Sequence, residues 1–274
     1  MEIGFFTLPE KIWNEKKGKF VNNKLYSWDE LEEFREKNKF NYIEFMIEHM
    51  YYYNTLNQKP KSCKICHLSL LDTPLLHKEN FEFVCKFYKM QILKYKKWFK
   101  IFDIHLPYRW LFVPKKVYLE RIENFAKFLE KLAKEKKVEI LLENELHSYE
   151  EFLVLTERDY KNLGITFDLG HAYMSYVTKR CKIHPFKFFN KIFDKVENIH
   201  LMDSHRNWKI HHEHLSLGKG SLPIKKFLSI LDHKGYDKML TLEMLKINDI
   251  KESRKYIQHS FNHFKPLIYG TNAT

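Results

Sequence analysis

The chain alternates along its whole length of 274 residues between short apolar, β-branched runs and longer amphipathic stretches. Short apolar runs bounded by turn residues indicate buried strands, and apolar residues repeated every three to four positions indicate helices. Strands that alternate with helices pair in parallel through right-handed crossovers. The eight predicted strands are Glu2–Thr7, Asn41–Ile47, Ser62–Leu68, Lys100–Leu106, Val138–Asn144, Gly164–His171, Val196–Asp203 and Lys238–Leu245.

Eight parallel strands with intervening helices fit a (β/α)8 barrel, for which about 250 residues are typical. No linker rich in Pro, Gly or Ser divides the chain. We therefore predict an α/β fold with a single TIM-barrel domain over residues 1–274, and an open, doubly wound sheet is the alternative. Two capping boxes, Ser27 with Glu30 and Ser148 with Glu151, predict helix starts between these strands.

The net charge of +12 at pH 7 favours partners that carry phosphate. The Lys- and Glu-rich, Gln-poor composition is equally typical of proteins adapted to heat, so charge alone does not identify a partner. The sequence contains no apolar run of about 18 residues, so we predict no membrane-spanning helix. Residues 1–6 lack the basic leader of a signal peptide. The sequence thus predicts a cytoplasmic protein with reduced thiols, in which Cys63 and Cys66 belong to the core.

Six successive predicted strands each end in a His or a carboxylate. The active sites of (β/α)8 barrels form at the C-terminal ends of the strands, so these side chains are expected to meet. One such His is more often structural, but several buried charges around one opening are costly unless a cation compensates them. Imidazole nitrogen and carboxylate oxygen are ligands of Zn²⁺ and similar ions. The candidates are His67, His105, Glu143, Asp168 with His171, His200 with Asp203, and Glu243, joined by His212 and His214 from the loop after the seventh strand.

Three motifs in the second half of the chain resemble those of one superfamily. Ile165–His171 contains Asp-x-x-His, Ile199–Ser204 contains His-Leu-x-Asp, and His212–Gly220 resembles the Asp-x-His…Gly-x-Gly loop that follows. Their order and spacing over residues 138–245 are similar to those of the xylose isomerase-like TIM barrels. That superfamily includes the endonuclease IV type (family 2) apurinic/apyrimidinic endonucleases and many sugar and sugar-phosphate isomerases and epimerases.

The endonuclease IV resemblance implies a zinc-dependent hydrolase of DNA repair. Such a phosphodiesterase cleaves DNA at abasic sites with a hydroxide held between metal ions, and up to three Zn²⁺ share nine ligands. The implied ligands are His67 and His105 for the first ion, Glu143 as a bridge, Asp168, His200 and Glu243 for the second ion, and His171, His212 and His214 for the third.

Two features depart from the endonuclease pattern. His212 stands where the family usually has Asp, although imidazole is a competent zinc ligand. Residues 68–71 follow His67 where the endonucleases carry a Tyr that enters the DNA. Tyr51–Tyr53 are a candidate replacement for that ring.

The isomerase branch is the alternative, because the loop at His214–Gly220 resembles it at least as closely. This branch needs one Mn²⁺ or Mg²⁺, with Glu143 and Glu243 moving a proton at the carbon next to the carbonyl of a sugar or sugar phosphate. The ligands it implies are Glu143, Asp168, His200 and Glu243. A barrel that only binds a ligand is a third possibility.

Overall fold

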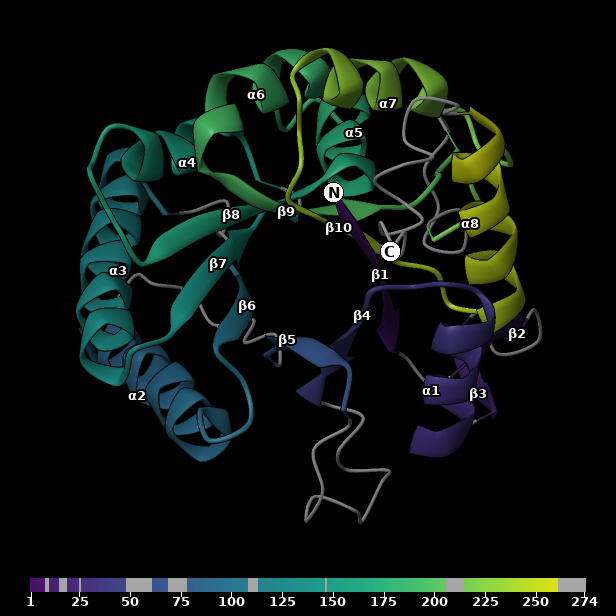
Figure 1. Ribbon diagram of the computed structural model, residues 1–274. Helices are drawn as coiled ribbons and strands as arrows, with labels where there is room; N and C mark the ends of the chain where they lie inside the picture. The colour runs from purple at the N-terminus through teal and green to yellow at the C-terminus, as the bar shows by residue number, and fades with distance from the viewer. Residues whose placement is uncertain are drawn as a thin grey trace. The chain divides into compact units, whose positions relative to one another are not determined.

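The computed structural model describes residues 1–7, 10–14, 19–24, 26–47, 61–68, 78–107, 113–145, 147–205 and 214–260. Eight strands close into a barrel, in the hydrogen-bonded order β1-β10-β9-β8-β7-β6-β5-β4 (Figure 1). This order confirms the predicted (β/α)8 barrel against the doubly wound sheet. The barrel strands are β1 (Glu2–Thr7), β4 (Tyr42–Met46), β5 (Cys63–His67), β6 (Ile101–His105), β7 (Glu139–Glu143), β8 (Leu163–Asp168), β9 (Val196–Leu201) and β10 (Met239–Leu242).

The chain divides into two compact units, which are described separately. The first combines Met1–Cys63 with Asn198–Thr274, and the second spans Lys64–Glu197. In the first unit β1 pairs in parallel with both β4 and β10, and β10 pairs in parallel with β9. In the second unit β5, β6, β7 and β8 pair in parallel, each with the next.

All eight predicted strands are present, and the clearest difference lies at the end of the sixth. β8 ends at Asp168, and helix α5 (Leu169–Val177) begins at the next residue. The Asp168 carboxylate accepts a hydrogen bond from the backbone N–H of His171, which makes Asp168 the N-cap. The prediction that this strand continues to His171 is therefore wrong. An antiparallel hairpin of β2 (Glu10–Asn14) and β3 (Lys19–Lys24) was also not predicted.

The helices of the second unit pack through apolar stripes that the sequence predicts. α3 (Lys115–Lys136) buries Ile122, Phe125 and Leu129 at helical spacing, and Figure 1 shows it beside α2 (Lys78–Tyr95). Burying one such side chain stabilises the fold by roughly 1.5–3 kcal/mol. The remaining elements are α4 (Tyr149–Thr156), α6 (Pro185–Ile192) and the short 3-10 helix η2 (Phe193–Lys195).

Only one of the two predicted capping boxes forms. At α1 (Trp28–Lys37), the Ser27 hydroxyl accepts from the Glu30 N–H, and the Glu30 carboxylate accepts from the Ser27 N–H. At α4 the Ser148 hydroxyl instead donates to the carboxylate of Glu151, so no side-chain cap forms there. Glu151 is buried, and the Ser148 hydroxyl supplies its carboxylate with a hydrogen-bond donor.

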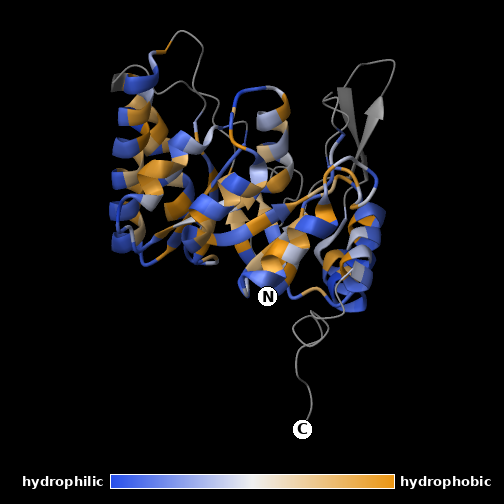
Figure 2. Cartoon of the chain, turned by 90° about the horizontal axis from the view of Figure 1, so that it is seen from above, coloured by the Kyte–Doolittle hydropathy of each residue, from blue (hydrophilic) through white to orange (hydrophobic). Residues whose placement is uncertain are grey.

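The barrel strands are largely buried on both sides, as expected where parallel sheets are covered by helices. Every residue of β8 is buried, as are all four of β10. Figure 2 shows helices with hydrophobic residues along one side and hydrophilic residues along the other. All four cysteines are buried and none forms a disulfide, which confirms the core placement predicted for Cys63 and Cys66. Among the described residues no helix is both long and apolar enough to cross a bilayer.

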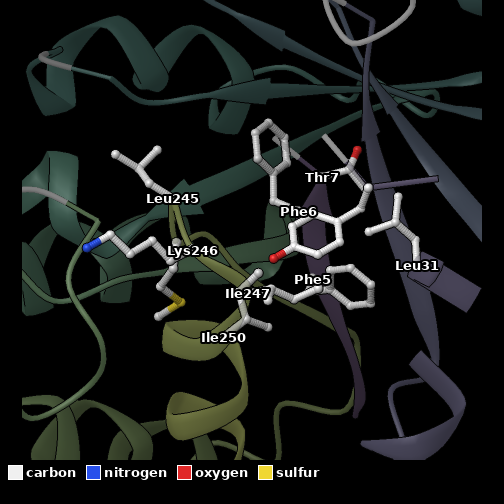
Figure 3. A pocket seen from close by; sticks show the side chains of 10 residues that line it. Phe5, Phe6, Thr7, Leu31, Leu245, Lys246, Ile247 and Ile250 are labelled. Carbon is white, nitrogen blue, oxygen red and sulfur yellow. The ribbon is translucent and has the colours of Figure 1, made fainter. Parts of the chain in front are cut away.

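An apolar pocket lies in the first unit, where β1 meets α1, α8 (Ile247–Ser260) and the segment after β10 (Figure 3). Lys246 is the basic residue of its lining, and its ammonium group points away from the Phe6 ring (Figure 3). The lining residues are Phe5, Phe6, Thr7, Tyr26, Leu31, Met244, Leu245, Lys246, Ile247 and Ile250.

Candidate functional site

In the second unit, the ends of three neighbouring strands bring two imidazoles and a carboxylate together. His67 ends β5, His105 ends β6 and Glu143 ends β7. The Nε2 atoms of the two imidazoles are 3.1 Å apart, and the Glu143 Oε2 is 2.9 Å from His105 Nε2 and 3.8 Å from His67 Nε2. Three donor atoms that lie within 4.8 Å of one another can hold a metal ion. The structure thus places together the three strand ends that the sequence predicts to meet, and their role as ligands stays a prediction.

His105 is flanked by two carboxylates. Its Nδ1 lies 3.3 Å from Glu145 Oε2, on the opposite side of the ring from Glu143. Burial by itself lowers the pKa of His105, but the charges and hydrogen bonds of Glu143 and Glu145 outweigh it and raise that pKa well above its ordinary value. Glu145 was not predicted from the sequence, although its place two residues beyond Glu143 is a usable signal.

Asp168 and His171 complete the polar end of the second unit. The Asp168 N–H donates to Asn144 Oδ1 at 2.9 Å, and Asn144 Nδ2 donates to the Asp168 carbonyl at 2.8 Å, which ties β8 to β7. From the first turn of α5, His171 places its Nδ1 3.8 Å from Asp168 Oδ1 and 3.9 Å from Glu143 Oε1. One imidazole therefore faces two buried carboxylates.

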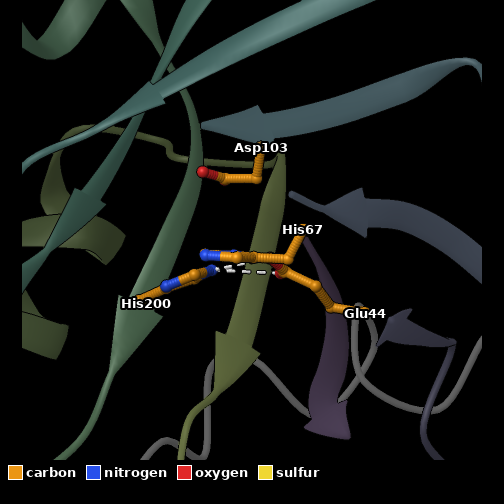
Figure 4. Close-up of side chains that lie close together, drawn as sticks. All are labelled: Glu44, His67, Asp103 and His200. Carbon is orange, nitrogen blue, oxygen red and sulfur yellow. Dashed lines mark hydrogen bonds and ion pairs between the residues drawn. The ribbon is translucent and has the colours of Figure 1, made fainter. Parts of the chain in front are cut away.

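In the first unit, His200 lies between two carboxylates (Figure 4 shows the one on β4). Its Nε2 is 3.0 Å and 3.1 Å from the two carboxylate oxygens of Glu44, and its Nδ1 is 3.2 Å from Glu243 Oε2. His200 and Glu44 have no exposed surface, and Glu243 is 7% exposed. The predicted pair of His200 and Glu243 thus meets. Glu44 was missed, and the only signal for it is a single Glu inside the apolar strand β4.

Of the other predicted site residues, His214 lies beside Glu243, whereas Asp203 faces its own loop. His214 has a left-handed backbone, and its Nδ1 lies 3.2 Å from the Glu243 carbonyl and 3.8 Å from Glu243 Oε1. His212, like Tyr51–Tyr53 and residues 69–71, lies outside the described residues. Asp203 belongs to the loop rather than to the ligands, because its carboxylate accepts the backbone N–H groups of Ser204, Gly218 and Leu222 at 2.8, 2.9 and 3.1 Å.

Gly220 is required by the packing of this loop. A Cβ atom there would lie 2.2 Å from Asp203 Oδ1 and 2.5 Å from the Ser204 carbonyl oxygen. We expect Gly220→Ala to lower the free energy of unfolding by about 3 kcal/mol, which urea denaturation measures. Gly235→Ala is the control, because its Cβ meets nothing within 4 Å and only its φ of +65° opposes the change. That control should lose about 1 kcal/mol, and equal losses would contradict the packing argument.

Both units therefore present the donor types of a divalent metal site. Imidazole nitrogens and carboxylate oxygens lie within 4 Å of one another in each, and nearly all of them are buried. Buried charges of this kind are costly unless they are paired or bound to metal. The donor chemistry fits Zn²⁺ as well as Mn²⁺. The chemistry that such a group can support is polarisation of an oxygen and proton transfer by the glutamates.

Two curated proteins of Methanocaldococcus jannaschii, both described as uncharacterised, are related in sequence. MJ1311 is 30% identical over 105 residues, covering 38% of this chain and 33% of that protein. MJ1614 is 30% identical over 127 residues, covering 44% of this chain and 46% of that protein. The chain thus matches less than half the length of these relatives.

Solved structures resemble nearly the whole chain. A D-tagatose 3-epimerase-like protein has a TM-score of 0.70 at 18% identity, with 95% of this chain and 97% of that chain covered. D-psicose 3-epimerase of Clostridium cellulolyticum H10, with bound D-tagatose, has a TM-score of 0.68 at 14% identity, covering 95% and 98%. The IolI protein with a bound zinc atom has a TM-score of 0.67 at 16% identity, with the same coverage.

These likenesses concern the fold, because identities below 20% do not carry a substrate with them. A model of one family also matches the sequence itself, over residues 93–267, which is more than half of the chain. That segment includes β6 to β10 and, with them, His105, Glu143, Asp168, His200 and Glu243. The chain belongs to the xylose isomerase-like TIM barrel family.

Proposed function

We propose that this chain is a divalent-metal-dependent isomerase or epimerase of a small sugar or sugar phosphate. The observation that carries the proposal is the position of His200 between Glu243 and Glu44. This position directs Nδ1 of His200 to Glu243, the carboxylate that we propose as a base. The neighbours support it, because those reported above with a named activity are sugar 3-epimerases. The proposed ligands of the ion are Glu143, Asp168, His200 and Glu243.

In this proposal the two glutamates move the proton. Glu243 removes a proton from the carbon next to the sugar carbonyl, and Glu143 returns one to the opposite face of that carbon or to its neighbour. A divalent ion, when bound, supplies Lewis-acid stabilisation of the negative charge that develops on the carbonyl oxygen. His67, His105, His171 and His214 contact substrate hydroxyls or a phosphate. We place this chemistry in the cytoplasm, where four free thiols remain reduced.

Proton exchange tests this function directly. The protein, loaded with Mn²⁺ or Zn²⁺, is incubated with a panel of ketoses and ketose phosphates in D₂O. Loss of the proton signal at the carbon next to the carbonyl is then followed by NMR. Exchange that depends on the metal supports the proposal. An absence of exchange with every sugar of the panel, from protein shown to contain metal, would rule out this class of substrate.

A second candidate, the phosphodiesterase of the endonuclease IV type, is favoured by one observation. His67, His105 and Glu143 have the ligand types and proximity of a separate metal site in the second unit, which a one-metal isomerase does not need. Nicking of a duplex oligonucleotide with a single abasic site, assayed with Zn²⁺ at moderate salt, separates the two candidates. Nicking that His67→Ala abolishes would favour the phosphodiesterase, and intact DNA would favour the isomerase.

A further inference from the structure

Glu44 is a buried carboxylate that the proposed proton transfers do not use. It lies in the middle of β4, has no exposed surface and is separated by 156 residues from His200, the imidazole that it contacts. A charged group in such a place is costly unless several donors satisfy it. Both of its oxygens lie within hydrogen-bonding distance of the same ring nitrogen, at 3.0 and 3.1 Å (Figure 4).

Two further donors hold this carboxylate in place. Thr241 Oγ1 on β10 donates to Glu44 Oε2 at 2.7 Å, and Asn198 Nδ2 on β9 donates to the same oxygen at 3.2 Å. The Tyr42 hydroxyl lies 2.8 Å from Thr241 Oγ1. Because the Thr241 proton points to Glu44, Tyr42 is the donor in that contact. Burial and then the charge of Glu44 raise the pKa of Tyr42 well above its ordinary value, so the phenol keeps its proton.

The consequence concerns the two nitrogens of His200. A carboxylate only accepts hydrogen bonds, so the nitrogen facing Glu44, which is Nε2, carries a proton. Nδ1 also faces a carboxylate, since it lies 3.2 Å from Glu243 Oε2. Glu243 and His200 are both ligands in the proposed function, so a bound ion takes the lone pair of Nδ1 and leaves the proton on Nε2. A carboxylate behind a metal-ligating imidazole fixes the tautomer and the ring orientation and makes the ligand more basic.

We propose that Glu44 is a positioning residue that holds His200 as the Nε2–H tautomer, with Nδ1 directed to the divalent ion. The inference rests on the proposed function, in which His200 is a ligand of that ion. The Glu44 carboxylate contacts His200, Thr241 and Asn198, and of these three only His200 is a proposed ligand of the ion. Glu44 therefore affects the affinity for the metal, whereas Glu143 and Glu243 carry out the proton transfer.

The first test is Glu44→Gln, which preserves the size of the side chain and removes its charge. The dissociation constant of Zn²⁺ is measured by competition with a chromophoric chelator. We expect the affinity to fall 10- to 100-fold, the range seen when such outer partners are removed. At saturating Zn²⁺ the exchange rate should return to within a few-fold of the wild type. The control is Glu151→Gln, another buried carboxylate, bonded to Ser148 on α4, which should leave the affinity unchanged.

A second measurement needs no variant. In the Zn²⁺-loaded wild type, ¹H–¹⁵N long-range correlation spectra report which nitrogen of His200 carries the proton. Nε2 protonated and Nδ1 bound to zinc is the expected result, and the reverse assignment would overturn the inference. Equal Zn²⁺ affinities for the wild type and Glu44→Gln would overturn it as well. If the wild type binds no divalent ion at all, the proposed function itself fails, which is a separate outcome.

Discussion

Replacing Glu243 by Gln is expected to lower metal-dependent proton exchange by about 10³-fold while the barrel stays folded. The amide has the shape of the carboxylate but accepts no proton at neutral pH. It also lacks the charge that Glu243 presents 3.2 Å from His200 Nδ1. The substitution therefore removes a base and weakens a ligand at once. The rate of deuterium incorporation into the responsive ketose, measured at saturating metal, gives the loss.

Glu157→Gln provides the matched control for that variant. Glu157 is an exposed carboxylate at the C-cap of α4, and no element of the candidate site contains it. Its exchange rate and melting temperature should equal those of the wild type. Full activity in Glu243→Gln would show that the carboxylate following β10 has no part in the chemistry. Unfolding of the variant, seen as a lost circular dichroism transition, would instead show a structural role.

Removing the divalent ion is expected to abolish exchange and to lower thermal stability. In the proposed function the ion would bind the folded chain and compensate the buried carboxylates at the strand ends, which would repel one another without it. At a free concentration 100 times its dissociation constant, a ligand adds about 2.7 kcal/mol to the free energy of unfolding. For a chain of this size that corresponds to a rise in melting temperature of roughly 5–10 °C.

Calorimetry of chelator-treated protein, with Zn²⁺, Mn²⁺ or Mg²⁺ added back, measures this difference. The same samples give the number of ions per chain by elemental analysis. One ion per chain agrees with the isomerase proposal. Three zinc ions per chain would support the nine-ligand set of the endonuclease resemblance, including His212. A melting temperature that does not respond to any of these ions would contradict a metal centre at the strand ends.

The fold was predictable from the sequence because its signal is local. A buried parallel strand is an apolar run, and a covering helix such as α3 repeats its apolar residues every three to four positions. The ends of the elements are decided by individual hydrogen bonds. Asp168 ends its strand because its carboxylate caps the next helix, and Ser148 fails to cap because Glu151 takes its hydroxyl. The hairpin of β2 and β3 carried no comparable apolar pattern.

The candidate site also has a part that the sequence predicts and a part that only the structure shows. His67, His105 and Glu143 could be predicted to meet, because each closes a strand and neighbouring parallel strands end at the same edge. Asp203 looked equivalent to them, yet its carboxylate holds the following loop through three backbone N–H groups. The sequence does not distinguish a carboxylate that faces the barrel opening from one that turns to its own loop.

By itself the sequence determined the barrel and the residue types at its strand ends, because periodicity and strand termination depend on neighbouring residues. Only the tertiary structure decided which of those residues are partners. Glu44 and His200 are 156 positions apart, and a lone Glu in an apolar strand gives no sign of what it will contact. Their pairing follows from the register that brings β4, β1, β10 and β9 together, and register is a property of the folded sheet.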